Sequence, residues 1–162
     1  MRALPLLLAA PLLGAAGEAP GLVPPVTPAC ISSPFGAREA AGPRASRLHG
    51  GIDLPAPAGA WVGAAAAGRV AAIRRRGAAG LEIDLAHPGG WVTRYAHLGA
   101  VVPALASGKR GVAQGERLGR VGRTGITYGT HLHFELLADG ARQDPARHLT
   151  LGPCNPVPGE ER

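Results

Sequence analysis

The chain has 162 residues, with 25 glycines, 16 prolines and a formal net charge of +6. This length fits one compact domain, and so many turn formers without a long helical apolar pattern exclude a helix bundle. Aromatic residues make up only 4% of the chain and no nucleic-acid motif is present, so we expect no nucleic-acid partner despite the positive charge.

Residues 1–19 predict a secretory signal peptide. A positive charge precedes an apolar run over residues 4–13, and small residues follow, with cleavage expected after Ala16, Gly17 or Ala19. The run is short and holds two prolines, so we expect no membrane span after cleavage and a periplasmic or extracellular protein. The alternative is an uncleaved tether at the membrane surface.

The rest of the chain divides by composition. Residues 20–30 form an extended Pro-rich lead-in, residues 31–150 the folded domain, and residues 151–162 a tail that is ordered at Cys154 and then frayed. Cys30 and Cys154 lie near the two ends, so in an oxidising compartment they are expected to form one disulfide, with two free thiols as the alternative.

Short strands separated by turn signals predict one mostly β domain of antiparallel sheets. The expected strands cover residues 61–75 (broken near Gly68), 81–87, 91–98, 116–123 and 131–138. "AHPGGW" is expected to form the hairpin turn between the second and third. We interpret the run Arg74–Arg76 as a solvated turn.

Alternation assigns side chains to faces of these strands. In "LEIDL", three aliphatic residues alternate with Glu82 and Asp84, which predicts one buried and one wet face. In "WVTRYAHL", the residues predicted to share a face are Trp91, Thr93, Tyr95 and His97.

The last predicted strand has the clearest pattern. In "HLHFELL", His131, His133 and Glu135 share one face. The opposite face carries Leu132, Phe134 and Leu136, which are expected to hold the strand against the core.

Several other residues are expected to be structural. His87 is assigned a surface or turn role, His148 to a terminal segment, and Asp144 to a turn or cap before Pro145. The two tryptophans, Trp61 and Trp91, are assigned to core packing, with the lining of a peptide groove as the alternative that they share with Tyr128.

The remaining histidines suggest a metal centre. His49 and Asp53 stand four residues apart, so in an extended segment both face the same way, and they are a normal ligand pair for Zn²⁺. With His97, His131 and His133, the chain can supply three ligands, an open coordination position and two further imidazoles. Two histidines and one carboxylate would also suit a non-haem iron site.

Five segments, in this order, carry a resemblance: "SSPFGAR", "LHGGIDLPAPAG", "GGWVTRYAHL", "GERLGRVGRTG" and "THLHFEL". Together they resemble the lysostaphin-type zinc metallopeptidases (the M23 family, or LytM domain) from about Ile31 to Leu149. The resemblance implies one Zn²⁺ ion held by His49, Asp53 and His133. It implies that His131 and His97 are catalytic residues that do not bind the metal.

The implied activity is that of a secreted endopeptidase that hydrolyses peptidoglycan cross-link peptides with a metal-activated water. We assign His131 as the base and His97 as the oxyanion stabiliser or proton relay, although these roles could be exchanged. Glu135 is expected to orient a histidine or to meet solvent. The alternative function is a non-catalytic LytM-type wall module that activates another hydrolase.

The sequence leaves the substrate bond open between glycyl-glycine bridges and D-alanyl-diaminopimelate cross-links. Tyr128 and Thr130 depart from the family pattern just before the His-x-His motif, as does "RRRGAAGLEIDL" before its strand, and both changes bear on specificity. We expect a monomer, and the sequence identifies no activator protein.

Overall fold

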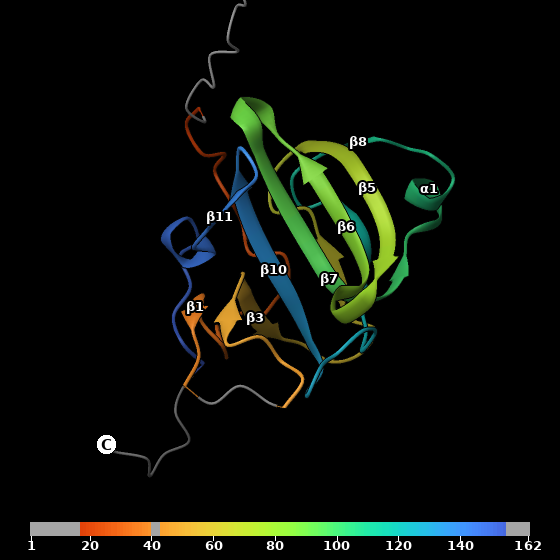
Figure 1. The fold of residues 1–162 in the computed structure, drawn as a ribbon. Coiled ribbons are helices and arrows are strands. Elements are labelled where there is room, and N and C mark those ends of the chain that lie inside the picture. Colours follow the sequence, from red (N-terminus) through yellow and green to blue (C-terminus); the bar gives the residue numbers. More distant parts are fainter. Residues whose placement is uncertain (1–16, 40–42, 155–162) are drawn as a thin grey trace, which may run out of the picture.

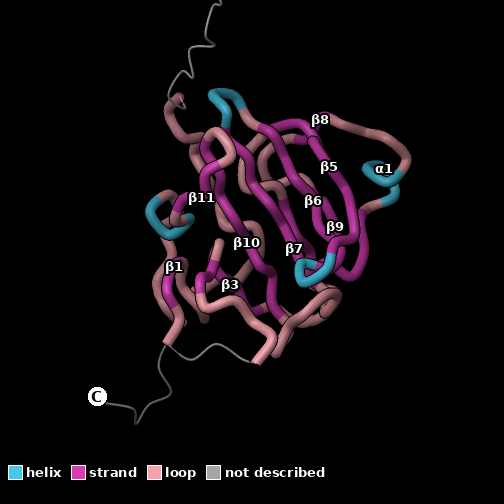
Figure 2. Tube along the Cα trace, viewed as in Figure 1, coloured by secondary structure: helices cyan, strands magenta, loops and turns pink. Residues whose placement is uncertain are grey.

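The computed structural model describes residues 17–39 and 43–154, which form a nine-stranded antiparallel sheet and a separate two-stranded one (Figures 1 and 2). The strands are β1 (Gly36–Ala37), β2 (Leu48–His49), β3 (Ile52–Pro55), β4 (Trp61–Gly63), β5 (Gly68–Arg76), β6 (Gly80–Ala86), β7 (Trp91–Val101), β8 (Gly111–Val112), β9 (Arg117–Val121), β10 (His131–Ala138) and β11 (Ala141–Gln143). The helices are α1 (Pro103–Ala106) and three short 3-10 turns, Gly77–Ala79, Pro88–Gly90 and Pro145–Arg147.

The order of the large sheet is β11-β10-β7-β6-β5-β8, and Figure 1 shows β10, β7, β6 and β5 running side by side. β3 adds to β10, while β9 joins the end of β7 to β4. The mostly β, antiparallel prediction is therefore confirmed. No helix in the described part of the chain is long and apolar enough to cross a membrane.

The core lies against one face of β10, as the alternation predicts. Leu132, Phe134 and Leu136 are all fully buried, and each buried side chain of this kind stabilises the fold by roughly 1.5–3 kcal/mol. Tyr95 packs against Phe134, and its hydroxyl accepts a hydrogen bond from the Ala65 amide. Burial raises the pKa of Tyr95 to about 12, so the phenol stays neutral.

The lead-in packs onto this domain. Val26 joins the core, and the Pro25 carbonyl accepts a hydrogen bond from the Gly63 amide. The expected Cys30–Cys154 disulfide is present. Residues 1–16, which hold most of the predicted signal peptide, and the tail beyond Cys154 lie outside the described residues.

The prediction that one face of "LEIDL" is exposed to water is wrong. Glu82 is fully buried and Asp84 nearly so, because arginines on the neighbouring strands cover both carboxylates. Arg74 on β5 contacts Glu82 at 2.6 Å, and Arg94 on β7 contacts Asp84 at 2.8 Å. The run Arg74–Arg76 is accordingly part of β5 and not the solvated turn that we expected.

His87 keeps the expected turn role but is not at the surface, and the core assignment of Trp61 is wrong. His87 is buried beside the hairpin turn, where its Nδ1 donates to the Ala67 carbonyl and its Nε2 contacts the Thr93 hydroxyl. Trp61 is 37% exposed, and the guanidinium groups of Arg117 and Arg120 stack over its ring. The arginines keep this ring at the surface, where cation–π contact replaces core packing.

The other structural assignments hold. Trp91 is buried, and the half-buried His148 ring meets its edge. Asp144 caps the turn at Pro145 by accepting a hydrogen bond from the Ala146 amide.

Candidate metal centre

Strand pairing brings the two halves of the centre together. β3 and β10 are antiparallel neighbours in a register that sets Asp53 opposite His133. This pairing is close because Gly51 has no side chain: a Cβ there would lie 2.2 Å from the Phe134 carbonyl oxygen. The adjacent pair β1–β2 sets Gly36 opposite His49 and holds that histidine at the same place.

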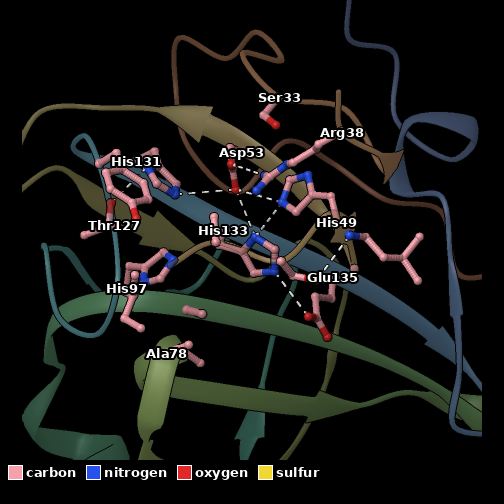
Figure 3. A pocket seen from close by; sticks show the side chains of 18 of the residues that line it. Ser33, Arg38, His49, Asp53, Ala78, His97, Thr127, His131, His133 and Glu135 are labelled. Carbon is pink, nitrogen blue, oxygen red and sulfur yellow. Dashed lines mark hydrogen bonds and ion pairs between the residues drawn. The ribbon is translucent and has the colours of Figure 1, made fainter. Parts of the chain in front are cut away.

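Three donor atoms converge (Figure 3). His49 Nε2 lies 3.1 Å from Asp53 Oδ1 and 3.0 Å from His133 Nδ1, and His133 Nδ1 lies 2.9 Å from Asp53 Oδ1. The possible ligand atoms of the three residues all lie within 4.8 Å of one another. Such a compact set of two imidazoles and one carboxylate could hold a metal ion and leave a coordination position open.

The outward nitrogens of both imidazoles face acceptors. His49 Nδ1 donates to the Pro34 carbonyl at 2.7 Å, and His133 Nε2 donates to Glu135 Oε1 at 3.2 Å. These partners assign the protons to the outer nitrogens, so both inner nitrogens present lone pairs toward a carboxylate. This donor arrangement fits a divalent cation.

Asp53 is oriented from outside the cluster. Arg38 Nη2 donates to Asp53 Oδ2 at 2.8 Å, while the backbone of Asp53 bridges to Ser33. Burial raises the pKa of the Asp53 carboxyl, but the close polar contacts with His133 and His49 outweigh it and hold that pKa well below its ordinary value. The carboxylate is therefore ionised and available as a ligand.

Glu135 is held as an anion behind His133, confirming that it orients a histidine. Burial raises its pKa, but the hydrogen bond from His133 and the nearby Arg142 and Arg94 lower it to about 2. Arg94 Nη1 donates to Glu135 Oε2 at 2.9 Å. Burial likewise works against the charged form of His133, but the two carboxylates raise its pKa above the ordinary value.

His131 and His97 form a second pair beside the cluster. Their rings meet edge to face with centroids 5.0 Å apart, and His131 Nε2 lies 3.4 Å from Asp53 Oδ1. Burial lowers the pKa of both imidazoles, so both are neutral at neutral pH. Neutral imidazoles can accept a proton, which suits residues that move protons rather than bind metal.

His97 does not share a face with Tyr95, contrary to our prediction. Its φ is +61°, an uncommon value for a residue with a side chain, and the turn of the backbone directs the ring into the groove while Tyr95 enters the core. His97 Nδ1 then donates to the Thr124 carbonyl at 2.9 Å. Strained residues of this kind concentrate at functional sites.

An open groove of about 1040 Å³ runs over these residues. Tyr128, 59% exposed, stands at its rim and accepts a hydrogen bond from the Arg44 amide, whereas Thr130 does not line it. The turn before β6, which departs from the family pattern, also lines the groove, through Ala78 and Ala79.

The sequence interpretation overlooked three supporting residues: Arg38, Pro34 and Thr124. Arg38 and Pro34 lie in "SSPFGAR", so the motif contained the signal, but only the fold shows which ligands they touch. Thr124 lies in "GERLGRVGRTG", another of the segments that carry the resemblance.

The sequence model described as peptidase family M23 matches residues 47–145. The chain belongs to peptidase family M23. "DD-carboxypeptidase/endopeptidase Mpg" of Neisseria meningitidis serogroup B is 41% identical over 115 residues, which are 71% of this chain and 26% of that protein. "Peptidoglycan DD-endopeptidase ShyA" of Vibrio cholerae is 33% identical over 113 residues, or 70% and 25% of the two chains.

Solved structures agree with this M23 membership. A zinc-containing peptidase from Vibrio cholerae is 32% identical and superposes with a TM-score of 0.62 over 74% of this chain and 37% of that one. The catalytic domain of lysostaphin from Staphylococcus simulans gives a TM-score of 0.63 at 23% identity, over 74% and 90% of the chains, which shows the shared fold. The M23 chain described here spans about a quarter of the length of the curated relatives, 26% for the first.

Proposed function

We propose that this M23 chain is a zinc endopeptidase that hydrolyses amide bonds in peptidoglycan cross-link peptides, with His49, Asp53 and His133 as ligands of one Zn²⁺ ion. The observation that carries the proposal is the convergence of these three donors beside two neutral imidazoles in an open groove. The names of the relatives support the substrate class, since one is a peptidoglycan DD-endopeptidase.

Zinc, when bound, supplies a Lewis acid for the scissile carbonyl and lowers the pKa of a water to about 7. The protein residues do the proton transfers. Because His97 Nδ1 donates to the Thr124 carbonyl, its Nε2 has the lone pair and can accept a proton from the attacking water. His131 Nε2, which faces Asp53 Oδ1, can donate to the developing oxyanion.

The contact of His97 with Thr124 and that of His131 with Asp53 together support the exchanged assignment, with His97 as base and His131 as oxyanion stabiliser. Both imidazoles have lowered pKa values, so either can also return a proton to the leaving amine near neutral pH. Glu135 and Arg38 fix the orientation of the proposed ligands and take no part in proton transfer.

The test is digestion of purified peptidoglycan by the zinc-loaded protein, with the fragments identified by mass spectrometry. We expect new amine ends with the intact protein and none with His131→Ala or His97→Ala, both of which should keep one equivalent of zinc. Absence of new ends with the intact, zinc-loaded protein would favour the non-catalytic wall module. Metal analysis of the purified protein separates zinc from iron.

We also propose that residues 1–19 direct export and that the protein acts as a monomer in the periplasm or outside the cell. The Cys30–Cys154 disulfide supports an oxidising compartment. N-terminal sequencing of the protein recovered from cell fractions tests cleavage, and a protein retaining Met1 in the cytoplasm would contradict export.

A further inference from the structure

Five arginines line the groove, and two of them, Arg44 and Arg142, have no ion pair shorter than 3.4 Å among the described residues. The five are Arg38, Arg44, Arg76, Arg94 and Arg142. Arg94 and Arg76 neutralise buried carboxylates of the sheet, and Arg38 is bound to Asp53. Of the two arginines without a close partner, Arg142, on β11, is the one that lies against Glu135 beside the metal cluster, and this position suggests a ligand.

The only ion pair of Arg142 among the described residues is a long one. Its Nε lies 3.4 Å from Glu135 Oε2, and that oxygen already accepts from Arg94 at 2.9 Å. The other Glu135 oxygen faces His133 at 3.2 Å. The carboxylate is therefore satisfied without Arg142, whose side chain is 53% exposed.

The Arg142 side chain passes over Gly50. A Cβ on Gly50 would lie 2.5 Å from Arg142 Nε and 2.8 Å from its Cδ, so the arginine crosses directly over the glycine next to His49. The guanidinium is thus placed beside the metal cluster, with one carboxylate between it and His133. Neither terminal nitrogen of Arg142 has a hydrogen-bond partner in the described part of the chain.

The geometry points to a carboxylate-binding subsite: we propose that Arg142 binds a free carboxylate on the carbon attached to the scissile nitrogen. This inference rests on the proposed function and narrows its substrate. A planar guanidinium with two unused terminal nitrogens suits bidentate pairing with a carboxylate. A bond between two D-residues that ends in a free carboxylate provides that group, whether the leaving residue is a terminal D-alanine or a diamino acid.

A bond inside a glycine bridge has no such group, because each internal carboxyl is part of the next amide. The subsite therefore selects D,D bonds over glycyl-glycine bonds, the two classes that the sequence leaves open. The name of the 41%-identical relative, a DD-carboxypeptidase/endopeptidase, agrees with this choice.

Measurements of peptide binding test this subsite independently of the proposed cleavage reaction. In the zinc-loaded His131→Ala protein, calorimetry should show that acetyl-L-Lys-D-Ala-D-Ala binds about 10- to 100-fold tighter than its C-terminal carboxamide. Adding Arg142→Gln should abolish that difference, and Arg142→Lys should restore part of it. Arg147→Gln, a change of an 83%-exposed arginine outside the groove lining, is the matched control and should preserve it.

Cleavage by the otherwise intact protein gives the second readout. Arg142→Gln should raise KM for the acid peptide about 10- to 100-fold, with unchanged zinc content and unchanged turnover of the carboxamide. Pentaglycine should be cut poorly by both proteins. Two results would overturn the subsite while leaving the peptidase proposal intact: equal affinity for the acid and the carboxamide peptides, or an equal loss of affinity for both peptides in Arg142→Gln. Discrimination in binding without any cleavage would instead overturn the peptidase proposal alone.

Discussion

Arg38 Nη2 donates to Asp53 Oδ2 over 2.8 Å, while Asp53 Oδ1 faces His49 and His133. The guanidinium therefore occupies one oxygen of the carboxylate and turns the other toward the proposed metal position. Contacts to the outer side of a ligand commonly contribute 10- to 100-fold to metal affinity.

We predict that Arg38→Gln lowers zinc affinity about 10- to 100-fold. Competition with a chromophoric chelator measures this directly and does not depend on cleavage. Arg44→Gln is the control, because Arg44 lines the same groove and its side chain has no ion pair among the described residues. Equal zinc affinity in the two variants would contradict the role of Arg38.

Replacing Gly51 should disturb the pairing of β3 with β10. An alanine Cβ would lie 2.2 Å from the Phe134 carbonyl oxygen and 2.9 Å from its carbon, and these backbone atoms can move aside only if β10 shifts. We expect Gly51→Ala to reduce the free energy of unfolding by about 2–4 kcal/mol. Gly111→Ala, where a Cβ meets nothing within 4 Å, should change it by less than about 0.5 kcal/mol in urea unfolding.

Thr124 should act on the reaction through His97. Its hydroxyl donates to the Leu98 carbonyl at 2.7 Å and accepts from the Leu81 amide at 2.9 Å. Its own carbonyl accepts a hydrogen bond from His97 Nδ1. Thr124→Val removes both hydroxyl contacts, so we expect kcat to fall about tenfold while the zinc content stays the same. Thr124→Ser keeps the hydroxyl and should restore kcat; failure of serine to rescue would argue against this positioning role.

His87 should make stability depend on pH. Burial lowers its pKa below the ordinary 6.5, so the unfolded chain binds more protons than the folded one when the pH falls below that value. The stabilisation is present above about pH 6.5 and is lost progressively as the pH decreases. Thermal unfolding of the chelator-treated protein between pH 5 and 8 should show a Tm that falls at acidic pH, with a shallower fall in His87→Gln.

Removing the disulfide should lower the free energy of unfolding, because this bond closes a loop of 124 residues. The chain-entropy model gives about 4–5 kcal/mol for such a loop. We expect the double variant Cys30→Ser/Cys154→Ser to lose most of that in urea unfolding and to be insensitive to reductant. A loss below about 1 kcal/mol would mean that the packed lead-in already holds the two ends together.

Local sequence patterns correctly predicted side-chain orientation where it depends on residues of the same strand. Alternation in β10 placed His131, His133 and Glu135 on the groove face and their aliphatic neighbours in the core. The same argument was wrong for Glu82, since its burial depends on arginines from adjacent strands that alternation within one strand does not contain.

His97 shows a second limit of periodicity. Strand alternation assumes an extended backbone, and the φ of +61° at this residue reverses the face on which the ring lies. Its resemblance to a family position identified the residue, whereas spacing alone placed it on the same face as Tyr95. Arg38 is likewise recognised only through Asp53, a partner on β3.

The segment from Cys30 to Arg38 supplies the outer contacts of both His49 and Asp53, and its first residue is bonded to Cys154. The proposed centre gains its full set of supports only after Cys154 has been synthesised and bonded to Cys30, so we expect a reduced chain to hold the proposed metal more weakly. On the proposed function, the covalent link would make the onset of hydrolysis depend on the synthesis and oxidation of Cys154.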